Sequence, residues 1–181
     1  MQNLSIELKW IKKRYYYDNI NEKRLKNIFY FTLIWNIFEN ECCNRDAKIS
    51  THPKEIAQNI NGVSEQKINK IFDYFKNRYI TNGTINEIFK SFSFDKNNTC
   101  NTYKKFVKEK LKAQEVTLKE QIQALLYIAF RLRNNLYHGV KDVKKLYEQN
   151  ENFRQINIFL MEVNDNYSKK KGQLKCRHLL D

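Results

Sequence analysis

Glycine and proline are scarce: this chain of 181 residues contains four glycines and one proline. Both residues punctuate turns, and a sandwich or barrel needs such signals at roughly 8–12-residue intervals. The scarcity therefore excludes an ordinary all-β architecture and favours an all-α one. An apolar content of 41% is enough for a real core, and the length suits one domain.

Long apolar runs and paired cysteine motifs are also missing. The longest apolar stretch, "IFYFTLIW" at Ile28–Trp35, is shorter than the roughly 18 residues that suggest a membrane helix. The start, "MQNLSIELKW", lacks the apolar region of a secretory signal. No C-x-x-C spacing occurs, and the adjacent Cys42 and Cys43 suit neither a disulfide framework nor a zinc site. We therefore expect a cytoplasmic protein with no membrane contact, metal or cofactor.

Positive charge is in excess, with 33 Lys and Arg against 20 Asp and Glu, a formal net charge of +13. Such a field attracts polyanions, and nucleic acid is the commonest polyanion inside a cell. Coding bias is the other explanation, because the chain is rich in Lys, Asn and Ile together. The charge is compatible with an RNA partner but does not identify one.

Apolar spacing and capping residues predict a compact bundle of about six helices. Ser64 is expected to cap one helix, and capping boxes are expected at Thr84/Glu87 and Thr117/Glu120. The segment 45–55 is expected to be a loop, with Pro53 in a first helical turn. Six longer helices are expected at residues 4–17, 19–43, 64–80, 103–113, from 117 onward and 152–167, with a short helical piece after 84. One domain should span residues 1–168, followed by a basic tail at 169–181.

The segment that begins at Thr117 is the most regular amphipathic pattern in the chain. At about 100° per residue, its apolar residues fall on one face. These residues are Leu118, Ile122, Leu125, Leu126, Ala129 and Phe130. Arg133 falls in the middle of this face, whereas Arg131 points the opposite way, where we expect solvent. An unpaired buried charge costs several kcal/mol, so Arg133 requires a hydrogen-bond acceptor.

The helix expected at 19–43 offers an acceptor. Apolar residues surround it almost completely, so we expect it to be centrally buried. Thr32, Asn36 and Glu39 nevertheless fall on one narrow strip, which suggests that Glu39, with Asn36, faces Arg133. Alternatively, Glu39 lies near the helix end and meets water. The sequence does not decide between the two.

His138 lies five residues after Arg133, about 140° away on an unbroken helix. A helix end at Gly139, or a second copy of the chain, would allow the two side chains to share one site. Arginine holds phosphate and histidine transfers protons near neutral pH. This pair suits metal-independent RNA cleavage, in which the 2′-hydroxyl attacks the adjacent phosphorus.

The stretch "RNNLYHG" resembles the signature motif of the HEPN (higher eukaryotes and prokaryotes nucleotide-binding) superfamily, with Arg133, Asn134 and His138 at the matching positions. The resemblance implies a helical bundle and a homodimer whose two motifs share one cleft. It also implies an endoribonuclease that acts as a toxin, or as an effector of abortive infection or antiviral defence, with an antitoxin or defence-system partner. Glu39 would hold the arginine. Val140 replaces a tyrosine typical of one toxin subgroup, which favours the defence-associated type.

Other residues around the motif are candidates for RNA binding, namely Arg131, Tyr137 and Lys141. The aromatic and basic segment Trp10–Asn19 could stack on bases, or form an ordinary amphipathic helix. The segment Arg45–His52 also has arginine and histidine at the motif spacing, which we interpret as chance. The alternative function is a catalytically inactive HEPN-like module that binds RNA, nucleotide or a protein partner.

Overall fold

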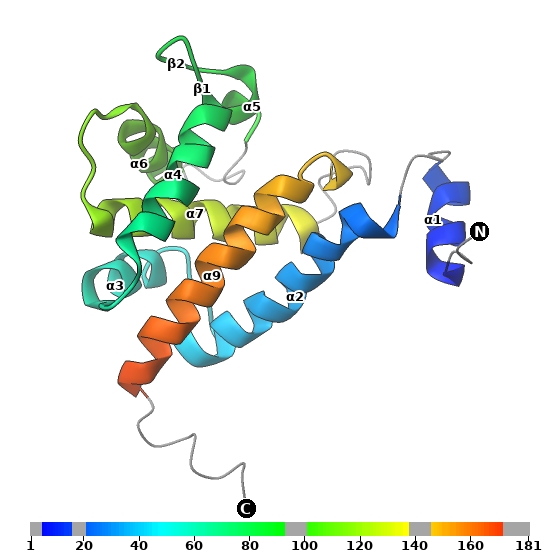
Figure 1. Ribbon diagram of the computed structural model, residues 1–181, viewed down its shortest axis with the longest axis horizontal. Coiled ribbons are helices and arrows are strands. Elements are labelled where there is room, and N and C mark those ends of the chain that lie inside the picture. The colour runs from blue at the N-terminus through cyan, green and yellow to red at the C-terminus, as the bar shows by residue number, and fades with distance from the viewer. Residues whose placement is uncertain (1–4, 16–20, 93–100, 138–145, 172–181) are drawn as a thin grey trace, which may run out of the picture.

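A computed structural model of the chain describes residues 5–15, 21–92, 101–137 and 146–171. These parts are mostly helical, which confirms the all-α class (Figure 1). The elements are α1 (Ile6–Tyr15), α2 (Glu22–Cys42), α3 (His52–Asn59), α4 (Glu65–Tyr79), β1 (Ile80–Thr81), β2 (Thr84–Ile85), α5 (Glu87–Lys90), α6 (Asn101–Lys112), α7 (Leu118–Tyr137) and α9 (Asn150–Lys171). The described residues thus form eight helices, more than the six expected, and α9 runs into the segment expected to be a tail.

Two of the helix starts follow the capping residues read from the sequence. The Ser64 hydroxyl accepts a hydrogen bond from the backbone N–H of Lys67 at 3.4 Å, at the start of α4. At the start of α7, the Thr117 N–H donates to the Glu120 carboxylate at 2.9 Å, and the Glu120 N–H donates to the Thr117 hydroxyl at 3.4 Å. This reciprocal pair is a capping box, as expected.

The capping box expected at Thr84 is wrong. Thr84 lies in β2, which pairs with β1 as an antiparallel hairpin. Asn82 and Gly83 form the two-residue turn with positive φ angles of 50° and 71°, and this residue pair favours such hairpins. Asn86 caps α5 instead, because its side chain accepts a hydrogen bond from the backbone N–H of Phe89 at 3.2 Å.

The helix α3 is a further difference from the expected pattern. It begins at His52, within the segment expected to be a loop, and Pro53 lies in its first turn as expected. Ile56, Ala57 and Pro53 are buried, and the helix packs against α7. Two helical turns are too short to give a clear apolar period, which is why the sequence pattern did not reveal them.

The centre of the molecule is α7. Figure 1 shows α3, α4, α6 and α9 around it, and all four helices pack against it. The aromatic rings of Trp35 and Phe38 on α2 meet Phe130 of α7 edge to face, with centroids 5.0 and 6.3 Å away. The helix α7 is therefore covered on nearly all sides along much of its length.

The helices α2 and α9 form the most extensive helix pair, and they run in the same direction. Near their starts, the Asn157 side chain donates to the backbone carbonyl of Asn27 at 2.9 Å. Near their ends, the Cys42 thiol donates to the Asn164 side chain at 3.3 Å. One side of α2 thus lies against α9 and α7, and the other carries exposed apolar residues. The expectation that α2 is centrally buried is therefore wrong.

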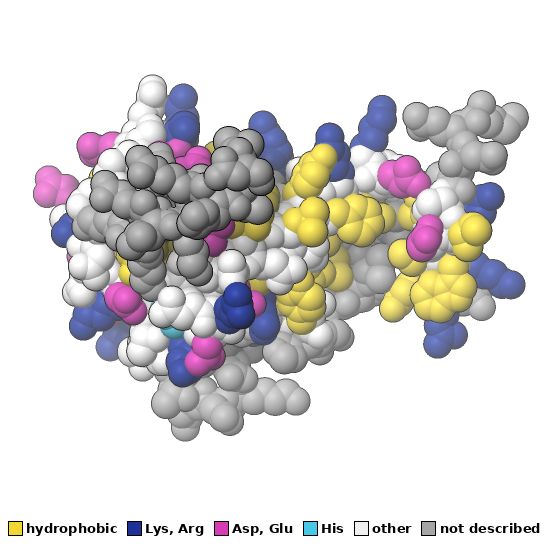
Figure 2. Space-filling model, turned by 90° about the horizontal axis from the view of Figure 1, so that it is seen from below, with side chains coloured by type: hydrophobic (Ala, Val, Ile, Leu, Met, Phe, Trp, Pro, Cys, Tyr) yellow, Lys and Arg dark blue, Asp and Glu magenta, His cyan; other side chains and the backbone are white. Residues whose placement is uncertain are grey.

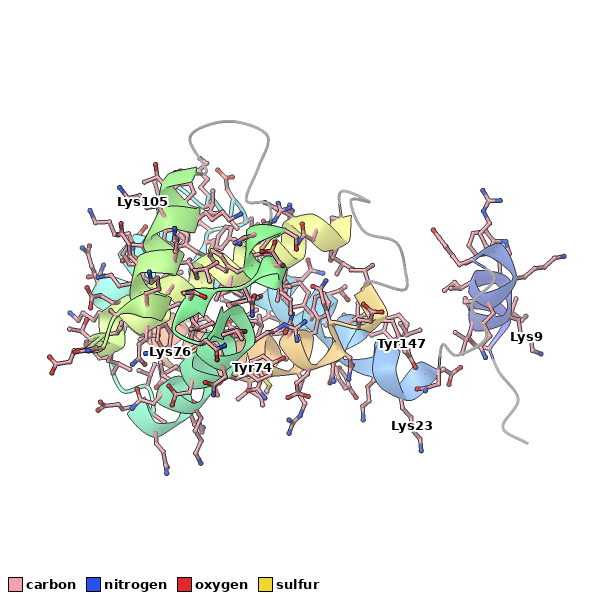
Figure 3. The ribbon with its side chains drawn as sticks, turned by 90° about the horizontal axis from the view of Figure 1, so that it is seen from above. Lys9, Lys23, Tyr74, Lys76, Lys105 and Tyr147 are labelled. Atoms are coloured by element: carbon pink, nitrogen blue, oxygen red, sulfur yellow. The ribbon has the colours of Figure 1, made fainter. Side chains whose placement is uncertain are left out.

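The helix α1 lies at the end of the molecule opposite α6, as the positions of Lys9 and Lys105 show in Figure 3. Leu8 is buried against Tyr147, and Ile11 and Leu25 pack beside them. Trp10 is exposed on α1. Among the described residues, no helix is both long and apolar enough to cross a membrane.

Candidate functional site around Arg133

Arg133 lies in the last described turn of α7 and is half-buried. Its guanidinium donates a hydrogen bond from Nη1 to Oδ1 of Asn134 at 3.3 Å. The same group lies over the ring of Tyr137, with its central carbon 5.3 Å from the ring centroid, a cation–π geometry. Tyr137 is half exposed. Three of the residues selected from the sequence therefore form one cluster on the end of α7.

The guanidinium of Arg133 keeps free donor capacity. A guanidinium carries five N–H donors, and the hydrogen bond to Asn134 is the one that Arg133 forms among the described residues. Its Nε is buried and has no hydrogen-bond partner there. A buried donor without a partner costs about 1–3 kcal/mol. A bound phosphate would contact the other N–H groups of the guanidinium, because the Nε is enclosed.

Glu39 does not contact Arg133 in the described structure. Its Oε1 instead accepts a hydrogen bond from the backbone N–H of Ala47 at 3.4 Å, and its backbone carbonyl accepts one from Arg45 at 2.9 Å. The expected pairing is thus absent, and Asn36 is exposed rather than turned toward the arginine.

Arg131 is buried, with 7% of its surface exposed, so the expectation that it meets solvent is wrong. The periodicity correctly separates it from Arg133, but α6 packs against α7 and carries Lys104 close to Arg131. Burial lowers the pKa of Lys104, and the charges of Arg131 and Lys108 lower it further. An enclosed guanidinium is not available to RNA, so the geometry does not favour the RNA-binding role expected for Arg131.

Asn135 is the residue that the sequence interpretation missed. It is 2% exposed, and neither its amide nitrogen nor its oxygen has a hydrogen-bond partner among the described residues. The indole N–H of Trp35 on α2 is also buried without a partner there. The sequence did contain a signal for this burial. Arg133, Asn134 and Asn135 are three consecutive polar residues on a helix with buried residues on every side, so they cannot all reach solvent.

No protein-family model, curated protein or solved structure matches this chain. The cluster around Arg133 must therefore be interpreted from its own geometry and chemistry.

Two further candidates, His138 and Lys141, lie outside the described residues. The distance between Arg133 and His138 is thus not part of the site's described geometry. Among the described residues, no group of three or more His, Cys, Asp or Glu side chains could hold a metal ion. The described site consists of Arg133, Asn134 and the exposed ring of Tyr137. The buried Asn135, four residues after Arg131, lies on the other side of α7.

Proposed function

We propose that the chain is a metal-independent endoribonuclease of the HEPN type. The observation that carries the proposal is the half-buried Arg133 at the end of α7, whose guanidinium forms one hydrogen bond among the described residues and keeps further N–H donors. Its neighbours are an orienting amide at Asn134 and an exposed ring at Tyr137. This combination suits a phosphate contact beside a stacked base. His138 follows directly in the sequence and supplies a group that titrates near neutral pH.

In the proposed reaction, the RNA 2′-hydroxyl attacks the neighbouring phosphorus, and the bond from phosphorus to the 5′-oxygen of the next nucleotide breaks. His138 transfers the proton, either from the 2′-hydroxyl or to the departing oxygen. Arg133 stabilises the negative charge that builds up on the phosphoryl oxygens. Asn134 keeps the guanidinium in position through its hydrogen bond. The products are a 2′,3′-cyclic phosphate and a 5′-hydroxyl.

One chain carries one such motif, so we propose a homodimer that brings two motifs into one cleft. The resemblance to defence-associated HEPN proteins supports a role as a toxin or an antiviral effector, with an antitoxin or a defence-system protein as partner. The net charge of +13 supports the attraction to RNA.

The test is cleavage of end-labelled single-stranded RNA by the purified protein in the presence of EDTA. Wild-type protein is expected to cut, and its products should carry the two chemical ends given above. Arg133→Ala and His138→Ala should each reduce the rate by at least about a hundredfold, since each removes a group that acts in the transition state.

Arg154→Ala is the matched control, because Arg154 is an exposed arginine on α9 that pairs with Glu151 within its own helix. It should leave the rate unchanged, and RNA with a single 2′-deoxy substitution should resist cleavage at that position. Intact RNA with wild-type protein, or equal rates for wild type and Arg133→Ala, would contradict the enzyme. Binding of RNA without cleavage would instead favour the inactive module.

A further inference from the structure

Most of the exposed large apolar side chains lie on α1 and α2. Among the described residues, ten large apolar or aromatic side chains are exposed, and seven of them belong to these two helices. The seven are Ile6, Trp10, Tyr15, Phe29, Tyr30, Leu33 and Ile37. Figure 2 shows apolar side chains over both helices on one face of the molecule. Contiguous exposed apolar surface of this kind marks an interaction site.

The helix α1 has one apolar side turned toward the molecule and another turned away from it. Leu8 is buried, whereas Ile6 is 82% exposed and Trp10 is 63% exposed. Ile6 and Trp10 are spaced by four residues, so they lie together on the outer side of the helix. The exposed Lys13 and Arg14 follow three and four residues after Trp10, which places their charges beside this outer side.

On α2, a line of apolar side chains faces away from the core. Phe29 and Leu33 are each 60% exposed and Ile37 is 47% exposed, and their spacing by four places them on one side of the helix. We call these three residues the outer α2 stripe. Lys26 lies at the α1 end of the stripe, where its Nζ is 5.4 Å from the centroid of the Tyr30 ring.

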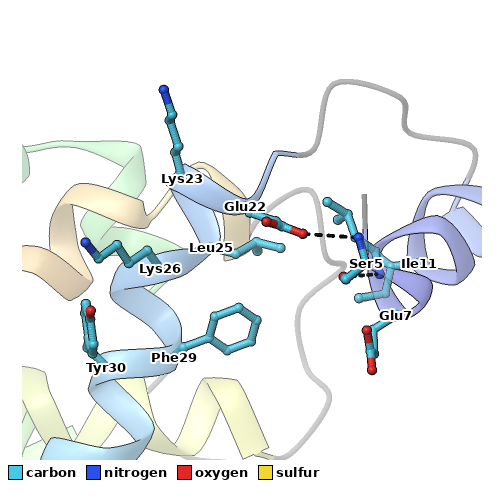
Figure 4. Close-up of a pocket in the computed structure, with 10 residues that line it drawn as sticks. Ser5, Glu7, Ile11, Glu22, Lys23, Leu25, Lys26, Phe29 and Tyr30 are labelled. Atoms are coloured by element: carbon cyan, nitrogen blue, oxygen red, sulfur yellow. Dashed lines mark hydrogen bonds between the residues drawn. The ribbon is translucent and has the colours of Figure 1, made fainter. Parts of the chain in front are cut away.

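A hollow joins the outer α2 stripe to α1. Its volume is about 440 Å³, and apolar side chains from both helices line it, among them Leu8, Leu25 and Phe29. Figure 4 shows the ring of Phe29 on the α2 side of this hollow, with Lys23 and Lys26 on the same helix. The hollow, the stripe and the outer side of α1 therefore form one surface, which we call the α1–α2 face.

Positive charge is in excess at the α1 end of this face. The basic side chains described on α1 and on the first turns of α2 are Lys9, Lys12, Lys13, Arg14, Lys23 and Lys26, and the acidic ones are Glu7 and Glu22. Glu22 also accepts a hydrogen bond from the backbone N–H of Ser5 at 3.3 Å. At the far end of α2, Glu39 and Glu41 outweigh Arg45, which donates to Asn40 at 3.0 Å. The excess of positive charge on the two helices thus lies around Trp10 and Phe29.

We infer that the α1–α2 face binds the surface of a membrane that contains anionic lipid. Exposed tryptophan and aliphatic residues with lysine and arginine beside them are typical of helices that lie in a membrane interface. The apolar side chains of Trp10, Phe29 and Leu33 enter the outer part of the bilayer, and the neighbouring cations meet lipid phosphates. The expectation of no membrane contact rested on the lack of a spanning segment, which an interfacial helix does not need.

Two other occupants fit this face less well. RNA would match the lysines, but aliphatic side chains such as Ile6 and Leu33 do not stack on bases and would stay exposed to water. A second copy of the chain would bring two faces with the same excess of positive charge together, and like charges disfavour such a contact. The inference does not rest on the proposed ribonuclease, and the proposed homodimer can form through another face.

The first test is sedimentation of the full chain with lipid vesicles. Wild-type protein should bind vesicles made of equal parts of phosphatidylcholine and phosphatidylglycerol, bind vesicles of phosphatidylcholine alone at least about tenfold more weakly, and dissociate as salt is added. Leu33→Asp should reduce binding at least about tenfold with unchanged helical content in circular dichroism. Ile88→Asp is the matched control, because Ile88 is 50% exposed on α5, and it should bind like wild type.

The charges are tested by the double variant Lys13→Gln with Arg14→Gln. It should reduce binding to the anionic vesicles at least about tenfold and make the binding less dependent on salt. The matched control is Lys105→Gln with Lys108→Gln, two exposed lysines of α6, at the end of the molecule opposite α1 (Figure 3). It should change binding little. Equal losses for the two double variants would show that net charge alone drives binding, which overturns the assignment to the α1–α2 face.

The second test uses fluorescence, because the chain contains two tryptophans and Trp35 is only 1% exposed. Trp10 should therefore report on the face, and its emission should shift to shorter wavelength when anionic vesicles are added. Trp10→Phe keeps an aromatic side chain, so it should still bind vesicles but lose the shift. Trp10→Asp should lose both.

Three outcomes would overturn the inference. Wild-type protein could fail to bind anionic vesicles, or Trp10→Asp and Leu33→Asp could bind them as well as wild type does. RNA could shift the emission of Trp10 where vesicles do not, which would make the α1–α2 face a nucleic-acid interface instead. Cleavage of RNA is a separate measurement, so vesicle binding without cleavage would leave the membrane contact standing and contradict only the ribonuclease.

Discussion

The helices α2 and α7 are both apolar on nearly every side, yet they differ in how much of their surface is buried. Four helices besides α2 pack against α7, whereas α2 is buried on one side and open along the stripe from Phe29 to Ile37. A run of apolar residues therefore shows that a helix requires cover. It does not show whether the cover comes from the same chain or from outside it.

The difference in burial also determines whether polar residues on the two helices reach solvent. On α2, Asn36 and Asn40 reach solvent at the side of the stripe, where their amides can bond water. On α7, Arg131 and Asn135 are buried. Enclosure raises the energetic cost of a polar group, so the polar residues of α7 are the ones that call for a functional explanation.

The largest expected effect compares one aromatic residue on each helix. Phe130→Ala should lower the free energy of unfolding by about 3–5 kcal/mol, because it leaves a cavity between Trp35 and Phe38. Phe29→Ala should lower it by less than about 0.5 kcal/mol under dilute conditions, since Phe29 is mostly exposed in one chain. Urea unfolding followed by circular dichroism measures both values.

The dependence on protein concentration is a second way to compare the stability costs of Phe29→Ala and Phe130→Ala. If a second copy rather than a membrane covered α2, the cost of Phe29→Ala would rise with protein concentration, because dimerisation stabilises the folded chain by mass action. The cost of Phe130→Ala should change little. Equal costs for the two variants in dilute solution would show that the outer side of α2 is not open.

A smaller effect of opposite sign is expected at Asn135. Asn135→Leu keeps a similar volume and removes two buried polar atoms that have no partner among the described residues. It should therefore raise the free energy of unfolding by about 1–2 kcal/mol. If Asn135 serves the site around Arg133, the same variant should cut RNA more slowly, which is a trade of function for stability.

Two measurements on one preparation decide this point, namely urea unfolding and RNA cleavage. Loss of stability in Asn135→Leu would mean that the amide contributes to the native structure after all. A gain in stability with full activity would mean that Asn135 has no part in the site.

The sequence predicted helices where long periodic patterns carry their own capping residues. The capping residue Ser64 and the box at Thr117 mark two starts correctly, because these signals are local. The hairpin at Asn82–Gly83 was missed, and of the short α3 only the place of Pro53 in a first helical turn was predicted. Both are only a few residues long, so their stability depends on packing that local patterns do not record.

The site could be predicted only in part. Helical periodicity placed Arg133 and Arg131 on different sides of α7, and that separation is found. Which neighbour covers each side depends on tertiary packing. The burial of Arg131 and the hydrogen bond of Glu39 to Ala47 in place of Arg133 could therefore not be predicted from a one-dimensional pattern. Asn135 was missed because the motif drew attention to the adjacent Asn134.

The smallest expected effect concerns the start of α7, which is partly exposed to solvent. The hydrogen bond from Lys110 to Glu120, with those from the backbone and hydroxyl of Thr117, lowers the pKa of Glu120 from 4.5 to about 2. A lowered pKa means that the folded chain favours the carboxylate. This stabilisation is therefore present above pH 4.5 and disappears as the pH falls toward 2.

Glu120→Gln should cost less than about 1 kcal/mol at neutral pH, because the pair is partly exposed. In urea unfolding at several pH values, the difference between wild type and Glu120→Gln should shrink steadily in acid. A difference that stays constant from neutral pH to pH 2 would mean that the charge of Glu120 does not stabilise this helix start.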